Sequence, residues 1–144
     1  MPEPARPAGP ALPPPPSAAP VPAPYELDGL RVIPGIPYGD LAGARPLELD
    51  LYLPVADRAV PVVVFCHGGG WRVGRRGSAG PMFRAPEPFA TLAAAGIAVA
   101  SIDYRLSGEA GWPAQLDDAV AAVDWLRRRG AEVGVDPGRL GVWG

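Results

Sequence analysis

The chain has 144 residues, 48% of them hydrophobic, and a formal net charge of −2, which suits a single globular domain. Its 13 basic residues are all arginine and are spread along the chain, which argues against a nucleic-acid-binding protein. With one cysteine and one histidine, the sequence offers neither an intramolecular disulfide framework nor the ligands of a usual metal site.

The sequence shows no targeting or membrane signal. Residues 1–24 lack the basic region followed by an apolar stretch that a secretory signal needs. No run approaches the roughly 18 apolar residues of a membrane span. A single cysteine fits a reducing compartment. We therefore expect a soluble, cytoplasmic protein that does not bind membranes.

The first 24 residues differ in composition from the rest. They hold 11 of the 21 prolines, including four in a row at positions 13–16. Proline supplies no backbone N–H, and this segment has almost nothing large to bury. We expect residues 1–24 to form a Pro/Ala-rich disordered tail and residues 25–144 to form the folded domain. A ligand for an SH3-type groove is an alternative role for the tail.

Three extended segments open the folded part. The first covers residues 31–37. Residues 47–53 alternate leucines with other side chains, which predicts a half-buried strand. Residues 60–66 carry an uninterrupted apolar run from Val62 to Cys66, which is typical of a central strand covered on both faces.

Helices and strands alternate in the second half. Residues 87–95 predict a short helix ended by Gly96, and residues 97–102 predict a second buried strand. The longest helix is expected over residues 113–129, with acidic residues near its start, arginines in its last turn and a glycine after it. Its apolar face is predicted to consist of Leu116, Ala119, Val120, Val123 and Leu126.

The last residues, 139–143, predict one more apolar strand. Strands that alternate with helices indicate an α/β fold with a mostly parallel central sheet and flanking helices, entered through an antiparallel-type amphipathic strand. We expect the last strand to be an unpaired apolar edge, which would favour self-association.

The strongest chemical signal is the run His67-Gly68-Gly69-Gly70-Trp71 at the end of a buried strand. Ligand sites in open α/β sheets lie beyond the carboxyl ends of the strands. Consecutive glycines let backbone N–H groups face a cavity without obstruction by a Cβ atom. The motif therefore indicates a loop that can stabilise a developing oxyanion.

With four further landmarks, this motif resembles the α/β-hydrolase-fold serine esterases, the HGGGW-type family of carboxylesterases, lipases and feruloyl esterases. The landmarks are Asp103-Tyr104-Arg105-Leu106, Trp112-Pro113, Asp136-Pro137 with Arg139, and Val142-Trp143-Gly144. The resemblance spans residues 25–144. It implies a partial α/β-hydrolase fold, truncated after the strand that leads to the nucleophile.

The resemblance also implies roles for individual residues. The backbones of Gly69 and Gly70 would form the oxyanion hole, with His67 and Gly68 supporting the loop and Trp71 lining the wall of the substrate pocket. In this family the nucleophilic serine lies in a G-x-S-x-G turn, and the acid and the histidine follow it. The chain ends at the position of the first glycine of that turn, so we expect no catalytic residue in this chain. Neither a cofactor nor a metal is implied.

Other catalytic arrangements fit the sequence less well. A local dyad would have to pair the one histidine with Ser17, Ser78, Ser101 or Ser107. Cys66 precedes His67, but adjacent strand residues point to opposite faces, so we expect an inert thiol. Asp103 closes a buried strand and is expected to make structural hydrogen bonds near the glycine loop. The arginine-containing segment 72–86 would border the pocket or form a solvated loop.

Two functions follow from the sequence. The first is a fragment of a serine hydrolase for carboxylic esters, which supplies the oxyanion loop; the full-length form would act on a small-molecule ester, and this chain alone would be inactive. The alternative is a non-catalytic pseudo-hydrolase half-domain with a binding or interaction role.

Overall fold

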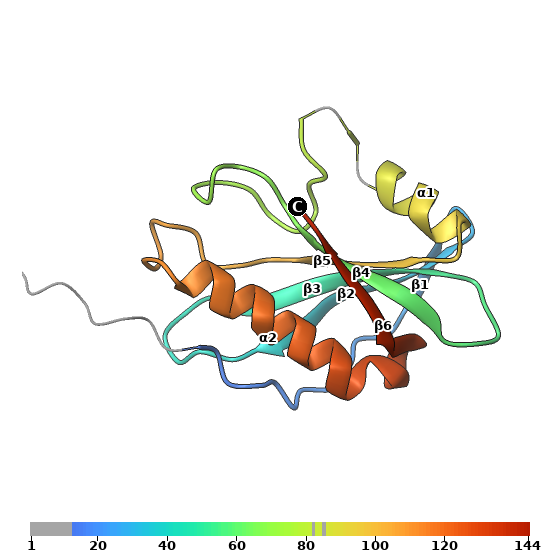
Figure 1. The fold of residues 1–144 in the computed structure, drawn as a ribbon, viewed down its shortest axis with the longest axis horizontal. Helices are drawn as coiled ribbons and strands as arrows, with labels where there is room; N and C mark the ends of the chain where they lie inside the picture. The colour runs from blue at the N-terminus through green and yellow to red at the C-terminus, as the bar shows by residue number, and fades with distance from the viewer. Residues whose placement is uncertain (1–12, 82, 85) are drawn as a thin grey trace, which may run out of the picture.

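The computed structural model describes residues 13–81, 83–84 and 86–144. In these residues one six-stranded sheet carries a helix on each face (Figure 1). The elements are β1 (Tyr25–Leu27), β2 (Leu30–Gly39), β3 (Leu47–Pro54), β4 (Val60–Cys66), α1 (Glu87–Ala94), β5 (Ala98–Ile102), α2 (Ala114–Arg129), a 3₁₀ turn (Gly130–Val133) and β6 (Val135–Trp143).

The sheet has the strand order β1-β2-β3-β5-β4-β6. Its first part is antiparallel, since β1 pairs with β2, β2 with β3, and β3 with β5 in opposite directions. Strands β5, β4 and β6 are parallel. The predicted α/β fold is confirmed, with a mixed sheet whose parallel part brings the carboxyl ends of these three strands to one edge.

Two hydrophobic clusters hold the helices on the sheet. On one face, α2 packs through Trp125 and Leu126 against strand residues that include Leu49, Val62 and Ala100. On the other face, Phe89 of α1 lies among aromatic and aliphatic residues of the strands. Burial on both faces explains why β4 and β5 are almost wholly apolar.

The predicted apolar face of α2 is partly wrong. Leu116 and Val120 are about half exposed, at 49% and 50%. The helix instead buries Ala114, Gln115, Asp118, Ala122, Trp125 and Leu126. Hydrophobic periodicity missed this rotation because one inward position is a carboxylate, which forms a buried ion pair with Arg105.

Residues 13–24, which we expected to belong to a disordered tail, lie in an extended course along the end of β2 and past α2. Pro14 is buried, Ser17 N donates to the Tyr38 carbonyl, and Asp40 N donates to the Pro15 carbonyl. Arg129 Nη1 donates to the Ala19 carbonyl at 2.8 Å. Neighbouring segments therefore donate hydrogen bonds to the Pro15 and Ala19 carbonyls of this proline-rich stretch. Residues 1–12 lie outside the described part.

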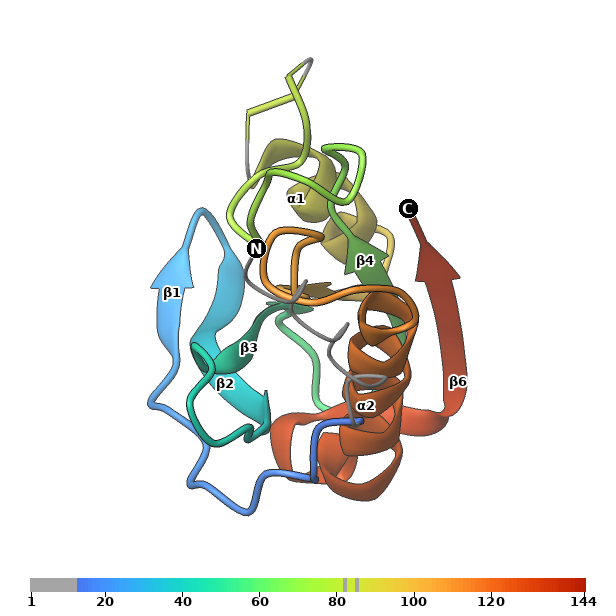
Figure 2. The same ribbon diagram turned by 90° about the vertical axis from the view of Figure 1, so that its left-hand side faces the viewer.

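Strand β6 lies at one edge of the sheet (Figure 2), but it is not the unpaired strand that the sequence predicts. Within the described residues it pairs with β4 alone. Val142 is 65% exposed, and Trp143 covers Phe65 on one side, with 4.7 Å between the ring centroids. The edge thus presents apolar side chains and unpaired backbone groups together.

Candidate active site

The glycine loop begins where β4 ends, at the carboxyl edge of the parallel strands. It leaves the sheet at His67, turns through Gly69 and returns towards the sheet at Arg76, beside the residues that follow β5 (Figure 1). This is the edge at which ligand sites of α/β sheets form. The sequence prediction had placed the loop on this edge.

A tight turn at Gly69 fixes the shape of the loop. Arg72 N and Val73 N both donate to the Gly69 carbonyl, at 3.2 and 3.3 Å. Gly69 has φ of +130°, and a Cβ atom added there would overlap the Val73 carbonyl, 2.8 Å from its carbon. Only glycine fits this position. Gly70 (φ +61°) and Trp71 (φ +65°) continue the turn in the left-handed region.

The backbone N–H groups of Gly69 and Gly70 are available to a ligand. Neither donates a hydrogen bond to any residue that the structure describes, and both residues are exposed. A Cβ atom added at Gly68 or Gly70 would meet no other atom within 4 Å. Two successive free donors beside open space can hold a negatively charged oxygen.

His67 fixes the first residue of the loop. Its imidazole is buried and stacks on the Tyr104 ring, with 4.3 Å between the centroids and 14° between the planes. The Tyr104 hydroxyl donates to the His67 carbonyl at 2.6 Å and lies 3.3 Å from Nδ1. Nδ1 also lies 2.9 Å from the Gly68 carbonyl oxygen. These contacts attach the loop to Tyr104, in the segment that follows β5.

Trp71 follows the glycines and is 53% exposed. Its ring lies 5.4 Å from the Tyr104 ring, and its carbonyl accepts a hydrogen bond of 2.8 Å from Ser107 N. The side chain therefore stands beside the open donors of the glycine loop, next to the segment that follows β5. An exposed aromatic ring in this place can contact the apolar part of a bound molecule.

Arg76 ends the loop in a cluster of carboxylates. Its Nε donates to Asp50 Oδ1 at 2.8 Å, its Nη2 lies 2.9 Å from Glu48 Oε2, and its Nη1 donates to Asp103 Oδ2. Desolvation alone would lower the pKa of Arg76, but the hydrogen bonds and charges of Asp50 and Asp103 outweigh it and raise that pKa. Arg76 is thus paired within the fold rather than part of a solvated loop.

A second, buried ion pair fixes the segment after Tyr104. Arg105 Nε and Nη2 donate to the Asp118 carboxylate on α2, at 2.7 to 3.0 Å, and Arg105 N donates to the same group at 2.7 Å. The Asp118 hydrogen bonds raise the pKa of Arg105. The pair joins the carboxyl edge of the sheet to the start of α2.

The serines and the cysteine do not form a catalytic pair with His67 in the described residues. The Ser101 hydroxyl donates to the Arg76 carbonyl at 2.7 Å, and Ser78 Oγ accepts from Gly80 N. Burial raises the pKa of the Cys66 thiol, which disfavours the nucleophilic thiolate. Within the same residues, no group of three or more His, Cys, Asp and Glu side chains could hold a metal ion.

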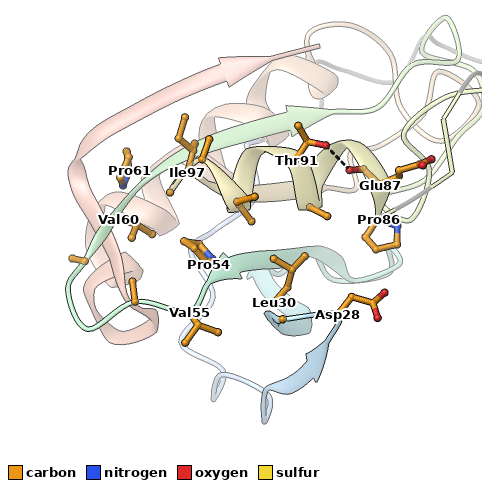
Figure 3. Close-up of a pocket in the computed structure, with 18 of the residues that line it drawn as sticks. Asp28, Leu30, Pro54, Val55, Val60, Pro61, Pro86, Glu87, Thr91 and Ile97 are labelled. Carbon is orange, nitrogen blue, oxygen red and sulfur yellow. Dashed lines mark hydrogen bonds between the residues drawn. The ribbon is translucent and has the colours of Figure 1, made fainter.

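A cavity of about 1210 Å³ lies at the opposite end of the parallel strands (Figure 3). It is lined by Leu30, Val60 at the start of β4, Ile97 before β5, and Thr91 of α1. The carboxyl ends that lead into the glycine loop are far along the strands from this cavity. It therefore does not belong to the candidate site.

No described helix has the length and apolar character needed to cross a bilayer.

Comparisons with known proteins agree with the fold. Carboxylesterase NlhH of Mycobacterium tuberculosis is 42% identical over 103 residues, covering 71% of this chain and 31% of the relative. Among solved structures, a Bacterial Heroin Esterase matches with a TM-score of 0.64 and 30% identity, over 82% of this chain and 36% of that chain. Esterase LipW from Mycobacterium marinum matches with a TM-score of 0.62 and 32% identity, over 79% and 34% of the two chains.

The sheet and the glycine loop define the class as the α/β-hydrolase-fold esterases, which confirms the resemblance. Within that class, the sequence profile of the BD-FAE family matches residues 49–144, and the chain belongs to this family. The chain spans less than a third of the length of the carboxylesterase that it matches, at 31%.

Sequence reasoning found the glycine loop but missed the cluster around Arg76. Two of the acids in this cluster, Glu48 and Asp50, occupy polar positions of β3, where alternation alone predicts solvent-exposed side chains. Asp103 was expected to make structural hydrogen bonds near the loop, and it accepts one from Arg76 N at 2.8 Å. Acidic residues on one face of a strand, together with arginines in a nearby loop, are the signal that could have predicted these ion pairs.

Proposed function

We propose that this chain is the oxyanion-loop part of a serine hydrolase that cleaves carboxylic esters. Gly69 and Gly70 supply backbone donors to the oxyanion, His67 and Gly68 support the loop, and Trp71 forms part of the pocket wall. The nucleophilic serine, the acid and the catalytic histidine lie beyond Gly144, so the 144 residues alone do not turn over substrate. The length of the matched carboxylesterase, of which the chain covers 31%, supports this division.

The observation that carries the proposal is the pair of open N–H groups at Gly69 and Gly70 on the carboxyl edge. When a serine attacks an ester carbonyl, the carbonyl oxygen becomes an oxyanion in the tetrahedral intermediate. Fixed donors stabilise that charge more than the neutral ester, and each is worth a factor of ~10²–10³ in rate. The loop geometry meets this need with backbone groups alone.

The place of Gly144 supports a nucleophile next to the loop. A Cβ atom added at Gly144 would lie 3.3 Å from the Cys66 carbonyl oxygen, so β6 ends beside the last residue of β4. A strand-to-helix turn that continues from β6 would emerge next to His67. A serine in that turn would reach a carbonyl carbon whose oxygen lies on the glycine loop.

The same relatives support the substrate class that we propose. The matched proteins are named as a carboxylesterase and as esterases, which supports a small-molecule ester as substrate. Our proposal includes a cytoplasmic location and no nucleic-acid or membrane partner, as the sequence predicted.

The test is to express the complete gene and measure release of para-nitrophenol from para-nitrophenyl butyrate. We expect turnover that a serine-directed phosphonate abolishes, with one phosphonyl group added per chain by mass spectrometry. The 144-residue chain, assayed beside it, should show neither turnover nor an adduct. An inactive complete protein that the phosphonate does not label would contradict the proposed function.

The second candidate function, a non-catalytic half-domain that associates through β6, rests on the exposed edge. Val142 is 65% exposed, and β6 has one described partner strand. Edge strands of this kind pair with other chains unless charges block them. Sedimentation velocity on the 144-residue chain should show self-association that Val142→Lys reduces. A monomeric chain that melts cooperatively would contradict this candidate.

A further inference from the structure

We propose that Arg76 is a positioning residue for the glycine loop, which holds the N–H groups of Gly69 and Gly70 in place by fixing the far end of the loop to three carboxylates. This inference rests on the proposed function, because the loop matters to catalysis only if it binds the oxyanion. Arg76 itself touches neither substrate nor reacting atoms and acts through the loop backbone.

The guanidinium group of Arg76 joins three carboxylates on the sheet. Each of its three nitrogens contacts a different acid: Nε contacts Asp50, Nη2 contacts Glu48 and Nη1 contacts Asp103. Glu48 and Asp50 belong to β3, while Asp103 follows β5. The planar fork of arginine suits several acceptors in fixed directions, whereas lysine offers a single compact charge. The side chain of Arg76 therefore ties the loop to two neighbouring strands.

The backbone of Arg76 is fixed as well. Its N–H donates to Asp103 Oδ1 at 2.8 Å, and its carbonyl accepts a hydrogen bond of 2.7 Å from the Ser101 hydroxyl. Ser101 is fully buried in β5. Side chain and main chain of one residue are thus both attached to the carboxyl edge, which leaves the end of the loop little freedom to move.

The attachment at Arg76 is transmitted to the glycines through close packing. Two residues before Arg76, Gly74 lies so near the start of the loop that an added Cβ atom would be 2.6 Å from the Gly68 carbonyl oxygen. Val73 N donates to the Gly69 carbonyl at 3.3 Å. The carbonyls of the two peptide groups that carry the open donors therefore lie against residues 73 and 74. A shift of Arg76 would move these contacts and the donors with them.

The nearest other cation cannot replace Arg76. Arg45 Nη1 lies 3.8 Å from Asp103 Oδ2, but Arg45 is held by Glu109 at 2.5 Å and by the Tyr104 carbonyl at 2.6 Å. The Glu109 hydrogen bonds raise the pKa of Arg45. Loss of the Arg76 guanidinium would leave Glu48 and Asp50 without this partner and would leave the loop end held by the main chain of residue 76 alone.

The test compares Arg76→Lys with Arg129→Lys in the protein encoded by the complete gene. Arg129 also pairs with a carboxylate, Glu132 at 2.9 Å, and with a backbone carbonyl, but at the far end of α2. We expect Arg76→Lys to lower kcat for para-nitrophenyl butyrate about tenfold or more, because misplacement by ~1 Å costs up to 10²-fold. KM should stay nearly constant, and Arg129→Lys should change neither constant.

A second readout is amide hydrogen exchange over residues 67–78, measured by mass spectrometry on the same three proteins. Exchange should speed up in Arg76→Lys alone. If Arg76→Lys does not fold, Asp50→Asn takes its place. This substitution weakens one contact of Arg76. It keeps a side-chain oxygen that can accept the hydrogen bond that Gly35 N donates to Asp50 Oδ1 at 2.8 Å. We expect it to act in the same direction with a smaller loss.

The outcomes separate this inference from the proposed function. An unchanged kcat in Arg76→Lys overturns the positioning role, and so does a loss that Arg129→Lys matches. If the wild-type protein hydrolyses no ester, the proposed function fails, and hydrogen exchange alone decides. Faster exchange in Arg76→Lys alone then supports the anchoring of the loop, while equal exchange in all three proteins overturns it.

Discussion

Replacing Gly69 by alanine perturbs the oxyanion loop at its tightest point. The added Cβ atom would overlap the Val73 carbonyl, 2.8 Å from its carbon, and the residue would have to keep φ at +130°. A non-glycine residue in such a backbone region costs about 1–3 kcal/mol, so the turn should open instead. The Gly69 N–H would then leave its place beside the Gly70 N–H.

The expected size of the effect is the loss of at least one oxyanion donor. That loss lowers kcat by ~10²–10³, or about 2.7–4 kcal/mol of transition-state stabilisation. KM should change little, since the neutral ester depends less on these donors. The assay is steady-state hydrolysis of para-nitrophenyl butyrate by the protein from the complete gene.

Gly43→Ala is the matched control for this variant. Gly43 also has a positive φ, +77°, but an added Cβ atom would meet no other atom within 4 Å, and it lies in the turn between β2 and β3. It should cost some stability and leave kcat unchanged. Equal kcat values for Gly69→Ala and the wild-type protein would show that the Gly69 N–H does not hold the oxyanion.

Three further changes test the packing and the electrostatics. Phe89→Ala removes a fully buried ring that lies between the rings of Tyr52 and Phe65 and should lower the free energy of unfolding in urea by about 3–5 kcal/mol; a loss below 1 kcal/mol would contradict the packing of α1. Asp118→Asn leaves the buried Arg105 without its carboxylate and should cost about 3–5 kcal/mol in the same measurement. The Arg45 hydrogen bond lowers the pKa of Glu109 below its ordinary value of 4.5, so this group stabilises the fold above that pH and loses its effect as the pH falls through the folded-state pKa. Glu109→Gln should therefore flatten the loss of stability on acidification, and an identical pH profile would count against the pair.

Much of the fold could be predicted because the apolar patterns are strong. The run from Val62 to Cys66 has no strongly polar residue, and the strand after Gly96 is apolar except for Ser101, so the pattern predicts both buried parallel strands. The alternation in residues 47–53 gave the amphipathic strand that faces the core with its leucines. Hydrophobic periodicity is enough to predict a helix or strand when the same face of that element is buried along its whole length.

The rotation of α2 could not be predicted in the same way. Asp118 is fully buried, although carboxylates seldom are, because Arg105 reaches it from the carboxyl edge of β5. Trp125 follows seven residues later on the same face and fills the core. The ion pair between Arg105 and Asp118 is a tertiary contact between residues 13 positions apart. The periodicity of the helix sequence does not indicate such a contact.

The candidate site was half predictable. Three glycines in a row after a buried strand indicated a backbone that needs positive φ values, and two of the three have them. The Arg76 cluster depends on register, because β3 must pair antiparallel to β5 before Asp50 and Asp103 come to the same edge. Sequence spacing alone does not set that register, so the cluster emerged only from the structure.

The most direct test of the central claim is a crystal structure of the protein from the complete gene after reaction with a serine-directed phosphonate. The phosphonyl oxygen mimics the oxyanion of the tetrahedral intermediate. We expect this oxygen to lie about 2.7–3.1 Å from the backbone nitrogens of Gly69 and Gly70. An adduct whose oxygen is held by other groups, with both glycine N–H groups facing solvent, would contradict this expectation.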